Sequence, residues 1–399
     1  MILRRLARAA GAAPDEEALT ASAGLVAFLV MTALYALRPV RDAIGAGDAG
    51  LSGLVLMTLG ATAVLVPALL AMTVRRPRRE LVPIALRSFA FVLVALAAAL
   101  RLAPSHATVA AFFVASSALN LLAVSLVWGL FADAFARGAA GRLFGAVAAA
   151  GTLGAMTGSF ATGALVKVTG PFVLVGVTAL LLELAARASR RVPARTALTT
   201  DDDGSAPSST RPLLLAAAGY VVLFTFTSTI AYLEQARILR SALADTASRA
   251  ALLARIDLAV SALSLVAQLV GTSRVIAAVG TRGALVALPL ATGVGLAVLL
   301  VHPTLAYLVV FQTLRRTLDY ALAKPAREML FTTATVRARF DGKALVDTLV
   351  YRGGDALAAA AWGSVASFAG QGAVAISACV VWAGVALALV RASDDVAPS

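Results

Sequence analysis

The sequence is poor in charged and metal-binding residues. Only 14% of its 399 residues are Asp, Glu, Lys or Arg, against roughly a quarter in ordinary soluble domains. It has one cysteine and two histidines, too few for an internal disulfide or for a recognisable metal-binding spacing. No Walker A glycine–lysine pattern occurs, so nucleotide hydrolysis is not expected. We therefore predict that the protein is not an enzyme and uses neither a metal nor a cofactor.

Hydrophobic residues, in contrast, make up 60% of the chain, and the mean hydropathy is +0.89. A membrane-spanning helix needs about 20 apolar residues, so twelve helices would use about 240, which is close to the whole hydrophobic content. This composition excludes a soluble enzyme, a disordered chain and a disulfide scaffold. It predicts an all-α polytopic membrane protein that resides in the lipid bilayer.

Twelve apolar stretches lie between charged residues or Pro/Gly breaks, and we interpret each as a membrane span. They run at roughly 18–37, 51–74, 81–100, 107–132, 143–166, 171–186, 213–233, 248–271, 283–301, 304–323, 344–368 and 372–390. The polar segment at 191–212 is rich in Pro, Ser, Thr and Asp, which is typical of a flexible linker. We therefore predict an N-terminal six-helix bundle at 1–190, a cytoplasmic linker at 191–212 and a C-terminal six-helix bundle at 213–399.

The net charge of +13 comes from 34 Lys and Arg against 21 Asp and Glu. On a soluble protein this excess would suggest nucleic-acid binding. Here most basic residues lie in alternate loops between the spans, although Arg237, Arg240 and Arg249 weaken the contrast. The positive-inside rule then places both termini in the cytoplasm and makes the excess charge topogenic, with no nucleic-acid partner. Arginine outnumbers lysine 31 to 3, which favours a bacterial inner-membrane protein.

The two halves of the sequence show signs of an internal repeat. Gly141-Arg142 precedes span five and Gly342-Lys343 precedes span eleven, at an offset of 201 residues. Small residues occur further along both spans, at Gly154 and at Gly354, and such residues let helices approach closely in lipid. A six-plus-six arrangement is the plan of the major facilitator superfamily, in which a site between the halves opens alternately to each side.

Several spans contain ionisable residues, which are costly in a bilayer and usually face a cavity or a partner. In span ten, Gln312, Arg315 and Asp319 recur at helical spacing. Arg315 and Asp319 are expected to pair, which leaves Arg316 for an anion. Span eleven carries a similar set, namely Asp347, Arg352 and Asp355. The alternative for both spans is a charge network that holds helices together.

Spans one and seven carry further charges near their outer ends. The facilitator plan places Arg38 and Arg41 of span one opposite Glu234 of span seven, across the central cavity. The arginine fork suits phosphate or carboxylate, and Glu234 is expected to balance an arginine or to carry a proton. The alternative is interfacial anchoring. Asp133 is expected to be structural, and Asp257 in span eight is a candidate for helix–helix contact.

At three places the sequence resembles the ATP/ADP translocase family, the nucleotide transporters of plastids and obligate intracellular bacteria. These places are Leu37-Arg38-Pro39-Val40-Arg41-Asp42, then Glu234 with Arg237 and Arg240, and then Lys324 to Met329 with Lys343-Ala344-Leu345-Val346-Asp347. The resemblance implies that Arg41, Glu234 and Arg327 take part in transport. This chain departs from the family pattern because two lysines are arginines and Pro39 interrupts the first motif.

These observations lead to one hypothesis with two alternatives. We expect a monomeric secondary transporter that moves a phosphorylated, nucleotide-like anion by alternating access, with counter-exchange or proton coupling. The residues expected to bind substrate are Arg38, Arg41, Glu234, Gln312, Arg315, Arg316, Asp319 and Arg327. The expected gating or structural charge network is Asp133, Lys343, Asp347, Arg352 and Asp355. The alternatives are a proton-coupled exporter of lipophilic molecules and a non-transporting receptor or accessory subunit.

Overall fold

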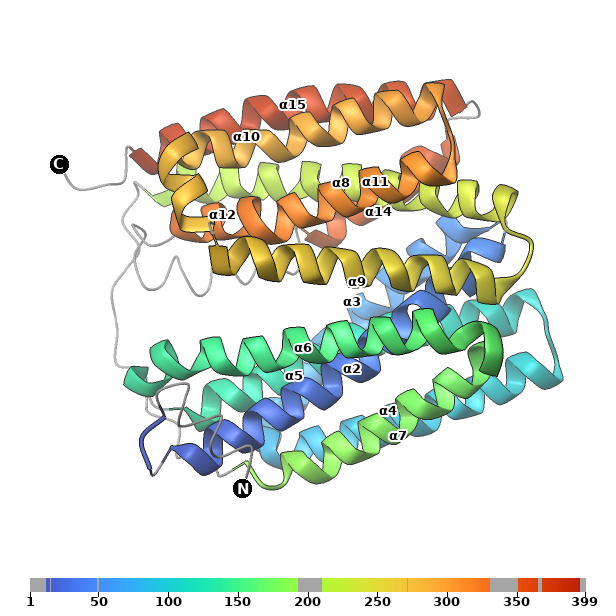
Figure 1. Cartoon of the computed structure of the whole chain (residues 1–399), viewed down its shortest axis with the longest axis vertical. Helices are drawn as coiled ribbons and strands as arrows, with labels where there is room; N and C mark the ends of the chain where they lie inside the picture. Colours follow the sequence, from blue (N-terminus) through green and yellow to red (C-terminus); the bar gives the residue numbers. More distant parts are fainter. Residues whose placement is uncertain are drawn as a thin grey trace. The chain divides into compact units, whose positions relative to one another are not determined.

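The computed structural model describes residues 12–14, 16–48, 50–135, 137–192, 210–270, 272–330, 351–364 and 368–394 (Figure 1). The regular elements in these ranges are helices. They are α2 (Glu17–Gly47), α3 (Leu51–Arg75), α4 (Arg78–Leu102), α5 (His106–Ala134), α6 (Arg137–Thr169), α7 (Pro171–Ser189), α8 (Thr210–Ala242), α9 (Thr246–Val270), α10 (Thr272–Val301), α11 (Leu305–Leu318), the π-helical turn η1 (Asp319–Ala323), α12 (Lys324–Leu330), α14 (Tyr351–Ser364) and α15 (Phe368–Asp394).

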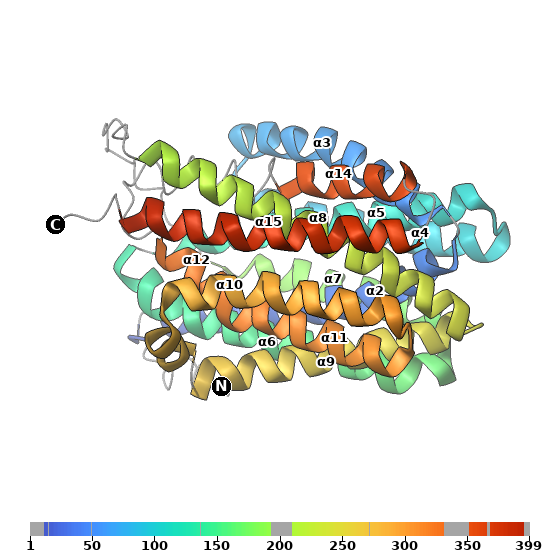
Figure 2. The same cartoon turned by 90° about the horizontal axis from the view of Figure 1, so that it is seen from above.

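The helices coincide with the apolar stretches of the sequence, so the predicted all-α polytopic fold is confirmed. Within the described ranges, ten helices are long and apolar enough to cross a membrane. The predicted tenth span, at 304–323, corresponds to α11 and η1, and α12 follows them without a loop (Figure 2). Local sequence sets several boundaries. Gly170 adopts a positive φ of 80° between α6 and α7, and Pro171 then begins α7.

The chain divides into two compact units. One contains the described residues of Met1–Ala49, Gly60–Thr199 and Leu243–Leu258. The other contains those of Gly50–Leu59, Thr200–Ala242 and Ala259–Ser399. Each unit thus includes one short segment from the other half of the sequence. Most of the predicted linker, at 193–209, lies outside the described residues.

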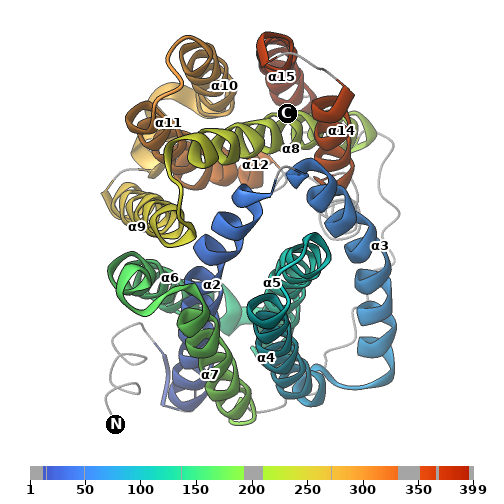
Figure 3. The ribbon, with the colours of Figure 1, turned by 90° about the vertical axis from the view of Figure 1, so that its right-hand side faces the viewer.

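In the first unit, α2 packs against α6 and α7, and α4 packs against α5 and α7 (Figure 3). Two glycines of α6 allow the closest approach. A Cβ at Gly154 would lie 2.3 Å from the carbonyl oxygen of Phe28, and one at Gly158 would lie equally close to that of Thr32. Thr162 of α6 also donates a hydrogen bond to the carbonyl oxygen of Ala36, at 3.1 Å. Small residues therefore bring these two backbones into direct contact, as expected for helices in lipid.

The second unit repeats this plan, since α8 packs against α14 and α15, and α10 packs against α15. Gly354 of α14 corresponds in its role to Gly154, because a Cβ there would overlap the side chain of Thr225 on α8. An aromatic core holds α8 to α15. Tyr220 and Trp382 pack edge to face with ring centroids 5.3 Å apart, and the Tyr220 hydroxyl donates to the carbonyl oxygen of Leu285 at 3.3 Å.

Candidate functional site

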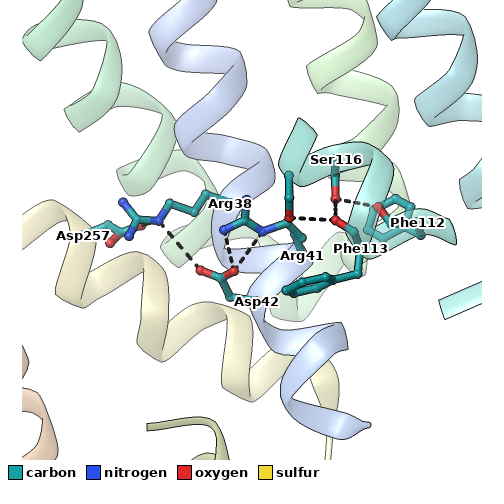
Figure 4. A network of polar contacts seen from close by, with 8 residues as sticks. Arg38, Arg41, Asp42, Phe112, Phe113, Ser116 and Asp257 are labelled. Carbon is teal, nitrogen blue, oxygen red and sulfur yellow. Dashed lines mark hydrogen bonds and ion pairs between the residues drawn. The ribbon is translucent and has the colours of Figure 1, made fainter. Parts of the chain in front are cut away.

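The first cluster of charges lies on α2 and on the part of α9 before Ala259, which belong to the first unit (Figure 4). The Nε and Nη2 atoms of Arg41 donate to Asp42 Oδ1 at 2.9 and 2.7 Å. The Nε atom of Arg38 lies 3.7 Å from Asp42 Oδ2 and 4.0 Å from Asp257 Oδ2. Both carboxylates are buried, with 6% and 3% of the residue exposed. Two arginines and two aspartates thus form one network, in which the charges of the four side chains balance.

The two arginines of this cluster remain partly accessible. The side chain of Arg38 is 28% exposed and that of Arg41 is 13% exposed. The guanidinium carbon of Arg41 also lies 5.7 Å from the centre of the Phe113 ring, at the distance of a cation–π contact. An anion that enters this cluster must compete with Asp42 for Arg41. The cluster therefore suits a reaction in which an incoming anion replaces Asp42 as the partner of Arg41.

Arg249 forms a second contact between α9 and α2. Its Nε and Nη2 atoms donate to the carbonyl oxygens of Leu243 and Ala244 at 2.9 and 2.7 Å. Its Nη1 atom donates to the carbonyl oxygen of Ala43 at 3.2 Å. The residue is 7% exposed, and it fills the space beside Gly47, where a Cβ would meet Nη1 at 2.7 Å. One buried guanidinium therefore satisfies carbonyls at the ends of two helices.

A separate polar cluster lies on α8 and α11 in the second unit. Arg315 is 8% exposed and donates from Nη1 to the hydroxyl oxygen of Ser228 at 2.9 Å. Its Nε and Nη2 atoms donate to Gln312 Oε1 at 3.3 and 3.2 Å. Gln312 in turn donates from Nε2 to the carbonyl oxygen of Ala231 at 3.2 Å. Neutral groups thus hold the three guanidinium nitrogens in a fixed orientation.

Positive charge is in excess on the helical segment that contains Arg315. Between Leu305 and Leu330, four basic residues stand against two acidic ones, a net charge of +2. The basic residues are Arg315, Arg316, Lys324 and Arg327, and each interacts electrostatically with Asp319. Asp319 begins the π-helical turn, and its backbone N–H donates to the carbonyl oxygens of Arg315 and Arg316. Both sides of this turn therefore carry cations.

Glu234 lies on α8 and is 5% exposed. Its Oε2 atom accepts a hydrogen bond from Arg237 Nε at 2.8 Å, whereas Oε1 is buried and has no hydrogen-bond partner among the described residues. The side chain lines a small cavity together with apolar groups of four helices. These are Ile230 of α8, Leu296, Leu299 and Leu300 of α10, Trp362 of α14, and Gly372 and Ala375 of α15.

The structure also places the remaining predicted charges. Asp133 accepts two hydrogen bonds from Arg78 Nη1, at 2.8 and 2.9 Å, so this loop arginine has a partner besides its topogenic role. Asp355 accepts from the Thr229 hydroxyl at 2.7 Å. Lys343 and Asp347 lie outside the described residues, as does the side chain of Arg352. Within the described residues, no three His, Cys, Asp or Glu side chains come together as a metal site.

Three members of these clusters are not among the predicted site residues. Asp257 is expected from the sequence only at a helix contact, Ser228 carries no charge, and Arg249 departs from the loop charge pattern. Asp257 could have been predicted as a cluster member, because a carboxylate within an apolar span needs a charged or polar partner. The ion pair of Arg87 with Glu183, with Nε 2.8 Å from Oε2, is a similar case. The other two residues act through backbone and hydroxyl groups, which leave no pattern in a sequence.

Neither a family model nor a curated protein matches this sequence. Solved structures do. A bacterial homologue of the iron transporter ferroportin, in an inward-facing state, is 13% identical with a TM-score of 0.65, over 95% of this chain and 98% of that chain. A mutant of the nucleoside transporter NupG is 13% identical with a TM-score of 0.64, over 95% and 99%. An auto-inhibited POT family peptide transporter is 12% identical with a TM-score of 0.64, over 94% and 96%.

At these identities the comparisons show the fold alone. The chain has the fold of major facilitator transporters, and it is a multi-pass integral membrane protein. The similar structures include a nucleoside transporter, a peptide transporter, and homologues of an iron transporter and of a lysosomal transporter, so they do not define a substrate. The resemblance to ATP/ADP translocases stays a prediction from the sequence motifs.

Proposed function

We propose that this protein is a secondary transporter that moves a phosphorylated, nucleotide-like anion across the bacterial inner membrane by alternating access. The observation that carries the proposal is the buried guanidinium of Arg315, which neutral groups on Gln312 and Ser228 orient. A buried cation within an apolar span is costly, and such residues mark substrate or ion pathways. The planar fork of arginine recognises phosphate oxygens in pairs.

The surrounding charges support the same substrate class. The segment from α11 to α12 has a net charge of +2, which favours an anion over a neutral or cationic substrate. On α2, Arg38 and Arg41 are balanced by Asp42 and Asp257, so they suit a role in admitting and releasing the anion in exchange for a carboxylate. We place both termini in the cytoplasm, from the distribution of loop arginines, and we propose that a monomer is sufficient.

The test is uptake of labelled ATP and ADP into proteoliposomes that contain the opposite nucleotide. We expect uptake by the wild-type protein and its loss in Arg315→Ala, Arg316→Ala and Arg41→Ala. Arg391→Ala is the matched control, since Arg391 is exposed in the last turn of α15 and belongs to neither cluster. Uptake that is unchanged in all three site variants contradicts the proposal. So does a wild-type protein that moves neither nucleotides nor other phosphorylated metabolites.

A second candidate is proton-coupled export of a lipophilic molecule. The observation in its favour is the cavity beside Glu234, which is lined by leucine, isoleucine and tryptophan side chains. This candidate predicts thermal stabilisation by amphiphiles and none by nucleotides. A thermal-shift screen with both kinds of compound therefore separates the two candidates, because a ligand stabilises only a protein that binds it.

A further inference from the structure

Glu234 is a buried acidic side chain that lies outside the cluster of Arg315, Gln312 and Ser228. It lies on α8, as Ser228 does, but it faces the cavity formed with α10, α14 and α15. One carboxylate oxygen, Oε2, is fixed by Arg237, while Oε1 is buried without a hydrogen-bond partner among the described residues. A buried carboxylate oxygen with no donor is costly in its charged form, and binding a proton lowers that cost because the group becomes neutral.

Among the described residues, the walls of the cavity carry no charged side chain besides Glu234. The lining residues from α10, α14 and α15 are leucine, tryptophan, glycine and alanine. The arginines of these helices are Arg274 and Arg282 of α10, Arg391 of α15 and Arg352 of α14, and each is at least ten residues from the lining positions, roughly 15 Å along a helix. The side chain of Arg352 lies outside the described residues, and His302, two residues after Leu300, is exposed. Asp355 of α14 accepts from Thr229, five residues before Glu234 on α8. In the part of the chain that the structure describes, Arg237 on the same helix is the cation that forms an ion pair with Glu234.

We propose that Glu234 binds the coupling proton of the transporter at Oε1. The hydronium ion supplies the proton, which leaves one water molecule and a neutral carboxyl group, while Oε2 keeps its hydrogen bond from Arg237. The proton leaves to water when the cavity opens to the other side of the membrane. This inference rests on the proposed transport function, but it concerns the ion that drives transport and not the anion that is carried.

The first experiment needs no transported substrate. Dicyclohexylcarbodiimide reacts with protonated carboxyl groups in apolar surroundings, and mass spectrometry of the digested protein locates the adduct. We expect an adduct at Glu234 that declines as the pH is raised, and its loss in Glu234→Gln. Glu183 is the matched carboxylate within a span, and we expect no adduct there because Arg87 and Arg187 both donate to it. Absence of labelling at Glu234 at every pH contradicts the proposal.

The second experiment separates coupling from transport. Nucleotide exchange is measured in proteoliposomes at equal pH on both sides, and accumulation is measured under an imposed pH gradient. We expect the ratio of accumulation with the gradient to accumulation without it to fall to one in Glu234→Gln, whatever its rate of exchange at equal pH. We expect Glu183→Gln to respond to the gradient as the wild-type protein does. Gradient-driven accumulation that survives in Glu234→Gln contradicts the proton site, whereas failure of exchange in the wild-type protein contradicts the proposed function.

Discussion

The Nη1 atom of Arg249 donates a hydrogen bond to the carbonyl oxygen of Ala43 at 3.2 Å, and this bond joins helices from opposite halves of the sequence. Arg38 and Asp257 connect the same two helices, α2 and α9. All four residues belong to the first compact unit, although their helices come from different halves of the sequence. Alternating access requires helix contacts on one side of the membrane to open at a time. These contacts lie at the predicted outer end of α2, so we expect them to hold the outer side closed.

Arg249→Ala is expected to open that side. Hydrogen bonds to a charged group contribute about 1.5–3 kcal/mol each. Loss of one such bond between the helices then shifts the population of open molecules by about tenfold or more. The readout is labelling of Ala46→Cys by a membrane-impermeant maleimide added outside. Ala46 is 2% exposed, and Cys379→Ala removes the only native cysteine.

The control for this measurement is Arg101→Ala. Arg101 is exposed at the end of α4, on the same predicted side, and its guanidinium carbon lies 5.7 Å from the centre of the Phe172 ring. Its labelling rate is expected to equal that of the parent. Equal rates in Arg249→Ala and the parent would refute a closing role for the Ala43 contact.

The glycines between α2 and α6 give a test of packing. Gly158→Ala places a Cβ 2.3 Å from the carbonyl oxygen of Thr32, so the helices must move apart. We expect a destabilisation of about 1–3 kcal/mol, which is typical of overpacking. Gly145→Ala, on the same helix, is the control because a Cβ there meets nothing within 4 Å. Thermal unfolding in detergent measures both, and a melting temperature for Gly158→Ala at or above that of the control would contradict the contact.

Ser228 is expected to act as a positioning residue for Arg315. Ser228→Ala removes the acceptor of the 2.9 Å bond from Arg315 Nη1. Because a hydrogen bond to a charged group contributes about 1.5–3 kcal/mol, we expect nucleotide affinity to fall by about tenfold. Turnover at saturating nucleotide is expected to change less than affinity. Ser228→Thr retains the hydroxyl and should restore binding, whereas Ser364→Ala, at an exposed position of α14, should have no effect.

Asp245 gives a prediction of pH dependence. It precedes α9, and its Oδ1 accepts from the backbone N–H of Ser248 at 2.7 Å. Hydrogen bonds from the Ser248 side chain and backbone lower the pKa of Asp245 below its usual 3.8. A group with a lowered pKa stabilises the folded state above its unfolded value, and this stabilisation is lost as the pH falls through the folded value.

The melting temperature of Asp245→Ala should therefore lie below that of the wild-type protein at neutral pH. The difference should stay constant down to pH 3.8 and shrink below it. Asp245→Asn keeps an acceptor for Ser248, so we expect a smaller difference. A difference between wild type and Asp245→Ala that grows as the pH falls would contradict the sign of this contribution.

The sequence is informative where a single physical requirement dominates. Each crossing of a bilayer needs about 20 apolar residues, so the spans are predictable from the apolar stretches. The small residues at Gly154 and Gly354 are predictable in the same way, because close helix packing in lipid excludes larger side chains. Both glycines contact the first helix of their own half, α2 and α8 respectively.

The site is predictable only in part. Gln312 and Arg315 share one helical face, and their spacing alone indicates the contact that is observed. Glu234 and Arg237 also have helical spacing, yet the facilitator plan indicates an arginine from span one as the partner of Glu234. The pairing of Arg38 with Asp257 depends on how helices from opposite halves pack, which one sequence does not specify. The roles of the predicted site residues in transport stay predictions.

The π-helical turn at Asp319–Ala323 changes the direction in which the basic residues after it point. A π turn accommodates one more residue than an α turn, and it rotates the residues after it by about 100° around the axis. Lys324 and Arg327 consequently lie on the helix face that the residues one position before them would occupy in a regular α-helix. Deleting Ala321 would restore the regular register and carry both cations to another face. One inserted residue thus determines the angle around the helix axis between the arginines before the turn, Arg315 and Arg316, and the basic residues after it.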